Sequence, residues 1–159
     1  MPKEKKLQPP QHQRRQPGRE HKMKPRPQAE DEKHRGSGKL QDKVAIITGG
    51  DSGIGRAVAI AFAKEGAHIS VVYLEEQKDA NETKRLVEEH GGECLLIKGD
   101  VGQEEFCRKA IARTVEEFGG VDVVVNNAAE QHHRIRLKEL PKSNLSGHFG
   151  QTFSRSFSW

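Results

Sequence analysis

Residues 44–55 read Val-Ala-Ile-Ile-Thr-Gly-Gly-Asp-Ser-Gly-Ile-Gly, an apolar run followed by a glycine-rich turn, and an amphipathic stretch occupies residues 56–64. The order of strand, glycine turn and helix is typical of a site that binds nucleotide phosphates. Glycines at positions 49, 53 and 55 allow a sharp turn, a close approach of the backbone to a pyrophosphate and tight packing of helix on strand. The N-terminus of the helix would supply unpaired N–H donors. This stretch therefore predicts phosphate binding beside the first strand.

From residue 43 onward, apolar runs and amphipathic runs alternate as in a parallel sheet crossed by helices. The last of these runs, 121–125, is apolar except for Asp122 and suits a strand buried on both faces, but without a fifth strand we expect it at a sheet edge with its apolar faces partly exposed. The pattern indicates the α/β class, with about four parallel strands and crossover helices. The expected strands are 44–48, 68–73, 94–97 and 121–125, and the expected helices are 54–65, 77–90 and 103–118.

The first part of the chain has a different composition. Residues 1–43 hold 13 Lys or Arg against 6 Asp or Glu, whereas residues 44–159 hold 14 against 17. This basic segment is rich in proline and glutamine, so it buries too little apolar surface to offset the entropy of ordering. We expect residues 1–38 to form a basic, disordered or extended arm in front of the α/β domain.

A solvated arm is favoured over a nucleic-acid-binding one. Acidic residues 30–32 interrupt the positive charge, and no aromatic side chain in the arm offers base stacking. The arm also lacks the apolar core of a secretory signal, and no stretch of 18 apolar residues occurs that would cross a membrane. The sequence predicts a cytoplasmic protein without nucleic-acid or membrane contacts.

The motifs of this chain resemble those of the short-chain dehydrogenase/reductase family, whose members are nicotinamide-dependent oxidoreductases with a Rossmann fold. The segment 48–55 is similar to the family's TGxxxGIG turn, Asp100-Val101 to its adenine-contacting acidic dipeptide, and the segment 126–129 to its NNAG motif, with Ala129 replacing glycine. The resemblance covers about residues 40–130 and implies that these residues form the N-terminal half of a three-layer Rossmann fold. It implies a cofactor site made of Thr48, Gly49, Gly50, Asp51, Ser52, Gly53, Ile54, Gly55, Tyr73, Asp100, Val101, Asn127, Ala128 and Ala129.

The Pro/Gln-rich arm resembles the N-terminal extension of a bacterial subgroup of this family, in which the extension wraps the oligomer. The resemblance therefore implies a role for the arm in assembly. It also implies a homo-oligomer, a tetramer, for the full-length family.

The choice between NAD and NADP is expected at the end of the second strand. A carboxylate there would hydrogen-bond the ribose hydroxyls of NAD, and a basic residue would hold the phosphate of NADP. The family's register puts Tyr73 and Leu74 at this position, followed by Glu75 and Glu76. These two carboxylates would repel a phosphate dianion, and Arg56 is the obvious counterweight. The cofactor is expected to be NAD or NADP, with NAD slightly favoured.

The family transfers hydride between nicotinamide and a small carbonyl or alcohol substrate. The resemblance implies a tyrosine as proton donor, a lysine four residues later that activates it, and an assisting serine and asparagine. The single tyrosine is Tyr73, at the adenosine end of the site, and Gln77 stands four residues after it. We expect no catalytic residue and no activity in this chain.

Two other functions are compatible with parts of the sequence. A non-catalytic dinucleotide-binding or regulatory module is the alternative to a truncated enzyme. A methyltransferase shares the first strand and glycine turn, but the Asn126–Ala129 run favours the dehydrogenase. A metal site drawn from Asp122, Glu130, His132 and His133 lacks a ligand spacing, so no metal is expected.

Residues 141–159 fit neither the helical nor the strand period. With one choice of synonymous codons, a frame reading TEEQFERTFRTNIFSIFFM, which resembles the helix carrying the family's asparagine, becomes PKSNLSGHFGQTFSRSFSW when its first base is deleted. The shifted product is residues 141–159 of this chain. We therefore expect a frameshift near residue 141, and three regions: the arm 1–38, an NAD(P)-binding Rossmann half-domain 39–140, and an out-of-frame tail 141–159.

Overall fold

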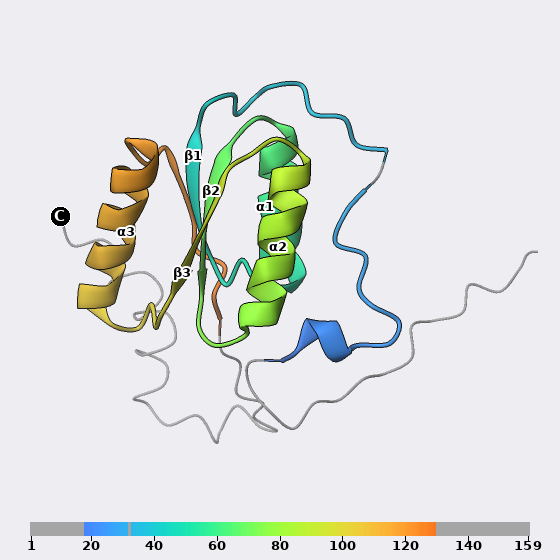
Figure 1. The fold of residues 1–159 in the computed structure, drawn as a ribbon, viewed down its shortest axis with the longest axis horizontal. Coiled ribbons are helices and arrows are strands. Elements are labelled where there is room, and N and C mark those ends of the chain that lie inside the picture. Colours follow the sequence, from blue (N-terminus) through green and yellow to red (C-terminus); the bar gives the residue numbers. More distant parts are fainter. Residues whose placement is uncertain (1–17, 32, 130–159) are drawn as a thin grey trace, which may run out of the picture.

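A computed structural model of the chain describes residues 18–31 and 33–129, and in this part a parallel sheet lies between helices (Figure 1). Helices α1 and α2 cover one face of the sheet, and α3 covers the other. The elements are η1 (Glu20–Lys22), β1 (Val44–Thr48), α1 (Gly53–Lys64), β2 (His68–Tyr73), α2 (Gln77–Glu89), β3 (Cys94–Lys98), α3 (Glu104–Phe118) and β4 (Val123–Val125).

The strand order is β3-β2-β1-β4, and every pairing is parallel. This order confirms the predicted α/β fold with its crossover helices. Each strand and each α-helix begins and ends within two residues of its expected bounds, whereas η1 in the arm was not expected. Helix α3 ends at Phe118 and is capped by Gly119, which has a left-handed φ of 83°. The N–H of Gly119 donates to the carbonyl of Val115 and so closes the last turn.

The core alternates across the sheet as the pleat requires. Ala45 and Ile47 of β1 face α1, where Ala59 and Ala63 are small enough to bring the helix close to the sheet. Ile46, between them in sequence, packs on the α3 side. The half-domain is thus held together by apolar contacts on both faces of β1 and β2.

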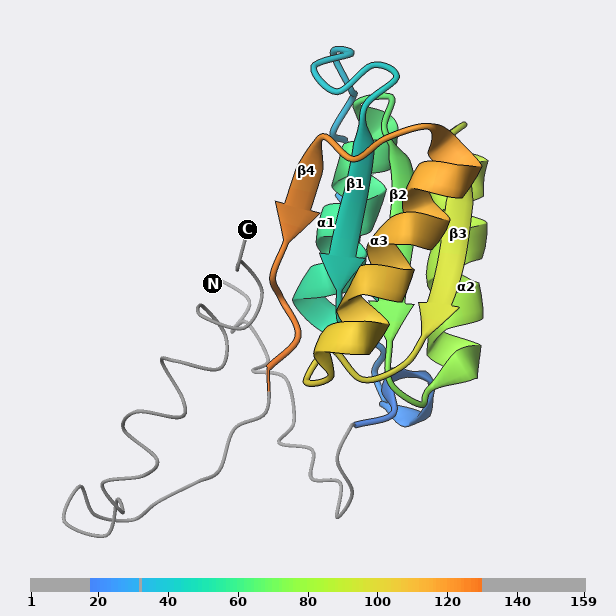
Figure 2. The same cartoon turned by 90° about the vertical axis from the view of Figure 1, so that its left-hand side faces the viewer.

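Strand β4 lies at an edge of the described sheet. Among the described strands it pairs with β1 alone, and Figure 2 shows it at the edge of the sheet. Its central residue, Val124, is 43% exposed, and Val123 and Val125 are half-buried. This is the position expected for the strand without a fifth one, because burial on both faces needs a neighbour at each edge and a covering layer on each side.

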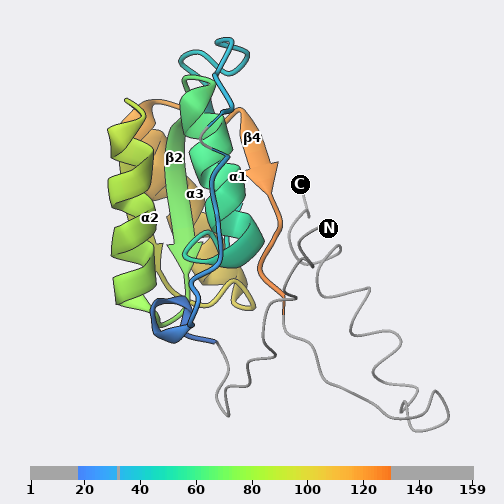
Figure 3. The same ribbon diagram turned by 90° about the vertical axis from the view of Figure 1, so that its right-hand side faces the viewer.

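Residues 18–31 and 33–38 of the arm follow an extended path along α1 and α2 (Figure 3). Their contacts are polar. Lys64 Nζ pairs with Glu30 at 2.8 Å, and the Glu65 carboxylate accepts bonds from the N–H groups of Ser37 (2.8 Å) and Lys39 (3.0 Å). The arm therefore docks without an apolar core of its own. Residues 1–17 and 141–159 lie outside the described residues, and the division into three regions stays a prediction.

No helix within residues 18–31 and 33–129 combines the length and the apolar character that a membrane span needs.

Candidate functional site

A cavity of about 630 Å³ opens at the carboxyl ends of the parallel strands. It lies where the strand order reverses between β1 and β4, the position at which open α/β sheets bind their ligands. Its walls come from the loops after all four strands and from the arm. The lining residues are Gly18, Arg19, Glu20, Met23, Pro27, Gly49, Asp51, Ser52, Gly53, Val72, Tyr73, Leu74, Gly99, Asp100, Val101, Asn127, Ala128 and Ala129.

The glycine turn between β1 and α1 needs its glycines for two reasons. Gly49 and Gly53 have φ values of 62° and 53°, in the left-handed region that glycine adopts without strain. At Gly55 a Cβ atom would overlap the carbonyl oxygen of Gly49 and would lie 2.6 Å from Asn127 Nδ2. The turn therefore packs against both its own first residue and the loop after β4.

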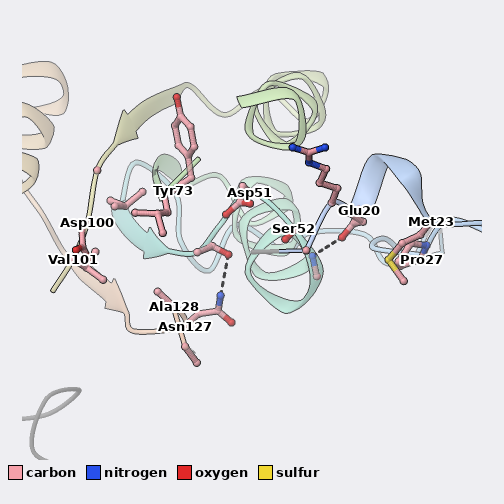
Figure 4. Close-up of a pocket in the computed structure, with 18 residues that line it drawn as sticks. Glu20, Met23, Pro27, Asp51, Ser52, Tyr73, Asp100, Val101, Asn127 and Ala128 are labelled. Atoms are coloured by element: carbon pink, nitrogen blue, oxygen red, sulfur yellow. Dashed lines mark hydrogen bonds between the residues drawn. The ribbon is translucent and has the colours of Figure 1, made fainter. Parts of the chain in front are cut away.

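Thr48 and Asn127 fasten this turn to the loop after β4. The Asn127 amide nitrogen donates to the carbonyl oxygens of Thr48 and Gly49, both at 3.0 Å. In return, Thr48 Oγ1 accepts bonds from the N–H groups of Asn127 and Ala128, both at 3.0 Å. Figure 4 shows the Asn127 amide directed at the turn. Two motifs that lie far apart in the sequence are thus one hydrogen-bonded unit.

The structure brings most of the expected site residues to the cavity. Four of them do not line it: Thr48 and Gly55 shape the turn from behind, Gly50 is buried, and Ile54 is 76% exposed. Their roles in cofactor binding remain predictions. The expected residues that line the cavity are Gly49, Asp51, Ser52, Gly53, Tyr73, Asp100, Val101, Asn127, Ala128 and Ala129.

Two sides of the cavity face each other in Figure 4, with Asp100 and Val101 on one side and Glu20, Met23 and Pro27 on the opposite side. The Asp100 carboxylate accepts a 2.8 Å bond from the N–H of Gly102, which holds the loop after β3 in a turn.

Tyr73, at the end of β2, is fixed by its neighbours. Its hydroxyl hydrogen-bonds Gln77 Oε1, and burial raises the pKa of the phenol. A tyrosine that donates a proton during hydride transfer needs the opposite shift, because efficient acid-base groups have a pKa near the operating pH. Tyr73 is therefore suited to a structural role and not to proton transfer.

Arg56 does not stand where the sequence-based prediction needs it. Its side chain is buried, 5% of the residue being exposed, and it points at α2 and the arm. Its Nε donates to Thr83 Oγ1 at 2.9 Å, and its terminal nitrogens reach the carbonyls of Asp51 (2.6 Å) and Asp79 (3.0 Å) and the carboxylate of Glu20. The expectation that Arg56 balances a cofactor phosphate is therefore wrong, because its guanidinium is buried, does not line the cavity, and is bonded to groups of the arm, the glycine turn and α2.

The arm wall was not predicted from the sequence. Gly18, Arg19, Glu20, Met23 and Pro27 lie among polar, low-complexity sequence, and no periodicity distinguishes them from their neighbours. Val72 and Gly99 also line the cavity and were not predicted, although each is adjacent to a predicted site residue, and Leu74, expected beside Tyr73 at the position that selects the cofactor, lines it too.

Four carboxylates gather where the arm meets α1 and α2. Burial raises the pKa of Asp51, and the nearby charges of Asp79 and Glu20 raise it further. The Asp79 carboxylate accepts bonds at 3.0 Å from the backbone N–H groups of Glu20 and His21 and lies 3.0 Å from His21 Nδ1. Glu76, the N-cap residue of α2, pairs with Arg19.

His21, Glu76 and Asp79 form the one group within residues 18–31 and 33–129 whose spacing would suit a metal ion. Because Asp79 already accepts from three groups of the arm and Glu76 pairs with Arg19, these side chains are accounted for as arm contacts. The loop with Glu130, His132 and His133, from which a metal site was considered and rejected, lies outside the described residues.

Comparison with known proteins places these features in one family. The family model described as short chain dehydrogenase matches residues 43–152, so the match runs into the segment attributed above to a shifted frame, and that attribution stays a prediction. The uncharacterized oxidoreductase YhdF of Bacillus subtilis is 59% identical over 140 residues, which cover 88% of this chain and 48% of that protein. General stress protein 39 of the same organism is 54% identical over 149 residues, covering 94% and 52%.

A solved structure agrees with the sequence matches. A short chain dehydrogenase from Burkholderia cenocepacia in complex with NADP superposes with a TM-score of 0.65 at 30% identity, covering 74% of this chain and 47% of that one. The chain spans about half the length of the curated relatives it matches. With the family model matching more than half of its residues and the expected sheet and glycine turn in place, the chain belongs to the short-chain dehydrogenase family of oxidoreductases.

Proposed function

We propose that the chain binds a nicotinamide dinucleotide in the cavity at the carboxyl ends of its strands, as the cofactor-binding half of an oxidoreductase. The observation that carries this proposal is the glycine turn. Gly49 and Gly53 have left-handed φ values, and a Cβ at Gly55 would overlap the carbonyl of Gly49, so this close turn at the start of α1, the usual place for a pyrophosphate, requires glycine.

The remaining cofactor contacts are assigned by resemblance. Asp100 would accept a hydrogen bond from the adenine amino group, and Tyr73 with Leu74 would flank the adenosine ribose. The carboxylates after β2 support the slight preference for NAD expected from the sequence. The relative from Burkholderia cenocepacia was solved with NADP, so both cofactors belong in the test.

We further propose that the 159-residue chain does not turn over carbonyl or alcohol substrates. Its single tyrosine is bonded to Gln77, and burial raises its pKa, so the chain offers no tyrosine suited to protonating a substrate oxygen. Substrates of the small carbonyl or alcohol class are proposed for the full-length family only. The alternative function, which the lack of a suitable tyrosine also fits, is that of a non-catalytic dinucleotide-binding or regulatory module.

A cytoplasmic location and a homo-oligomeric, tetrameric state of the full-length protein are proposed as well. Cys94 and Cys107 are both free thiols, which suits a reducing compartment. The oligomer rests on the resemblance of the arm. Light scattering coupled to gel filtration, with and without residues 1–38, tests whether the arm changes the molar mass.

Calorimetric titration of NAD⁺ and NADP⁺ into the 159-residue chain tests the binding proposal. Gly55→Ala should abolish binding, because the new Cβ overlaps the carbonyl of Gly49 and distorts the turn. Gly120→Ala is the matched control, since no atom lies within 4 Å of a Cβ built there. Circular dichroism checks that both variants remain folded.

Two outcomes would count against the proposal. Absence of binding by the folded wild-type chain contradicts dinucleotide binding itself. Cofactor-dependent turnover of an aldehyde that Gly55→Ala abolishes contradicts the proposed inactivity.

A further inference from the structure

The arm supplies a hydrogen-bond acceptor to the start of α1. Ser52 is the N-cap residue of this helix, a position from which a serine side chain usually accepts a backbone N–H of the first turn, but in the described structure its side chain makes no such bond. Instead, the Glu20 carboxylate accepts a 2.6 Å bond from the N–H of Gly53, the first residue of α1. The first N–H groups of a helix have no acceptor within the helix itself. The arm therefore provides one at the helix end where a pyrophosphate would bind.

The same carboxylate reaches the other side of the glycine turn through Arg56. Glu20 pairs with the Arg56 guanidinium, which donates to the carbonyl of Asp51 at 2.6 Å. Asp51 and Gly53 lie two residues apart, so one ion pair holds the main chain of the turn at both places. Thr83 Oγ1 also lies 3.0 Å from the Asp51 carbonyl. The Gly53 side of the turn therefore depends on the arm more than the Asp51 side does.

Glu20 is a lasting part of this arrangement. Glu20 is 6% exposed and Arg56 5%, and the backbone N–H groups of Glu20 and His21 both donate to Asp79 at 3.0 Å. Separating a buried ion pair leaves each charge uncompensated, so a ligand that enters the cavity would not easily displace Glu20. Because Arg56 matches its charge, the pair adds no net charge beside a pyrophosphate.

The arm and the glycine turn also share the cavity. Glu20, Met23 and Pro27 of the arm line it together with Ser52 and Gly53 of the turn, and Figure 4 shows Glu20 directed at the turn. A ligand that fills this cavity meets both segments in the arrangement that the docked arm creates. Two events that favour the same arrangement must favour each other.

We infer that Glu20 is a positioning residue of the dinucleotide site, which holds the glycine turn in its binding conformation from the arm. The inference rests on the proposed dinucleotide binding. Docking of the arm and binding of the dinucleotide then stabilise each other by the same factor in both directions. Because the effect passes through the glycine turn, it concerns the pyrophosphate, which NAD and NADP share, and not the adenosine end of the cofactor.

The first test compares Glu20→Ala and Glu20→Gln with wild type in the full 159-residue chain. Alanine removes the acceptor, whereas glutamine keeps an acceptor oxygen without the charge. Glu30→Ala is the matched control, because Glu30 belongs to the same arm and pairs with Lys64 but does not line the cavity. Calorimetry measures the affinities for NAD⁺ and NADP⁺, and ligand-observed NMR measures that for adenosine, which has no phosphate.

Glu20→Ala should weaken NAD⁺ and NADP⁺ by the same factor, about tenfold or more, and adenosine by less than about twofold. Glu20→Gln should fall between Glu20→Ala and wild type, because its amide oxygen can still accept from Gly53. Glu30→Ala should leave all three affinities within about twofold of wild type, since a partly exposed pair contributes little. Circular dichroism checks that the half-domain of each variant is folded.

The second test needs no substitution at Glu20. Trypsin cleaves after Lys22, which is exposed in η1, and the rate reports how often the arm leaves the half-domain. Saturating NAD⁺ should slow this cleavage in the wild-type chain by about fivefold or more. Gly55→Ala, which is expected not to bind the dinucleotide, should show no such protection.

Four results would overturn the inference and leave dinucleotide binding intact. The first is unchanged NAD⁺ affinity in folded Glu20→Ala. The second is tighter binding, which would make Glu20 an obstruction where a phosphate oxygen belongs. The third is an equal loss for adenosine, which would make the arm a wall of the cavity only. The fourth, decisive even if Glu20→Ala does not fold, is cleavage after Lys22 that NAD⁺ does not slow in the wild-type chain. A folded wild-type chain that binds neither dinucleotide refutes the proposed function itself.

Discussion

The half-domain is stabilised by apolar packing, whereas the arm is held on it by charged contacts. Around β1 and β2, fully buried aliphatic side chains such as Ile47, Ile69 and Val71 hold the layers together. The arm buries charged groups instead, and Glu20, Asp79 and Arg56 are each buried. The stabilisation that comes from apolar burial depends little on pH or on any single contact. The stabilisation that comes from a buried ion pair is lost when one member is removed or neutralised, because the other charge is left buried without its partner. The two regions should therefore respond separately to substitution and to acid.

Ile47→Ala should have the largest effect on stability. It removes a fully buried side chain between the sheet and α1, at a cost of roughly 3–4 kcal/mol in the free energy of unfolding. Urea denaturation followed by circular dichroism measures the loss. Ile54→Ala, at a 76% exposed position, is the control and should change stability by less than about 0.5 kcal/mol. Similar losses for the two variants would mean that the assigned core is wrong.

Glu20→Gln should release the arm and leave the half-domain folded. The substitution leaves the buried Arg56 guanidinium without its carboxylate, which costs about 2 kcal/mol because Gln can still accept one hydrogen bond. Trypsin should then cleave after Lys22 faster than in wild type, whereas Lys24 is not a cleavage site because Pro25 follows it.

A matched substitution distinguishes the loss of the buried Glu20–Arg56 pair from the loss of any one carboxylate charge. Glu104→Gln breaks an exposed pair with Arg108 on α3 and should have almost no effect. If Glu20→Gln unfolds the half-domain together with the arm, the two regions are one cooperative unit and the comparison fails.

Acid should detach the arm at Ser37 and Lys39 with a smaller effect. The N–H groups of Lys39 and Ser37 lower the pKa of Glu65 to about 2. A carboxyl group whose pKa is lower in the folded state contributes stability above its unfolded pKa, about 4.3, and this contribution disappears as the pH falls toward 2. Amide hydrogen exchange at Ser37 and Lys39, corrected for intrinsic rates, should therefore lose protection across this range. Glu65→Gln should remove the pH dependence, and its persistence there would assign it to another group.

The sequence predicted the elements well because their signal is local. Short apolar runs and glycine stops recur at regular distances, so the bounds of every strand and α-helix fall within two residues of expectation, whereas η1 lies in a segment without such a pattern and was not predicted. Hydrophobicity alone does not give the burial of β4, because it describes a strand and not its neighbours. Val124 is exposed in the described part of the sheet although β4 is entirely apolar, and this edge position was expected because no fifth strand was predicted.

The candidate site also contains parts that the sequence predicted and parts that it did not. The glycine turn and the Asn127 loop are contiguous motifs, and the structure joins them by hydrogen bonds. Arg56 was misassigned because its place after the turn says nothing about the direction of its side chain, which points at α2. Arg19 was missed because its neighbours in space lie more than 50 residues away in sequence, and a single charge carries no period.

The Arg56 guanidinium touches three separate segments: the arm through Glu20, the glycine turn through the carbonyl of Asp51, and α2 through Thr83 and Asp79. Loss of the carboxylate of Glu20 or Asp79 leaves the buried Arg56 guanidinium short of a charged partner, and loss of Arg56 leaves these carboxylates without theirs. Positions 20, 56 and 79 should therefore be inherited as a set. A lineage that lost the arm would be free to alter all three, and one that kept it would have to change them in concert.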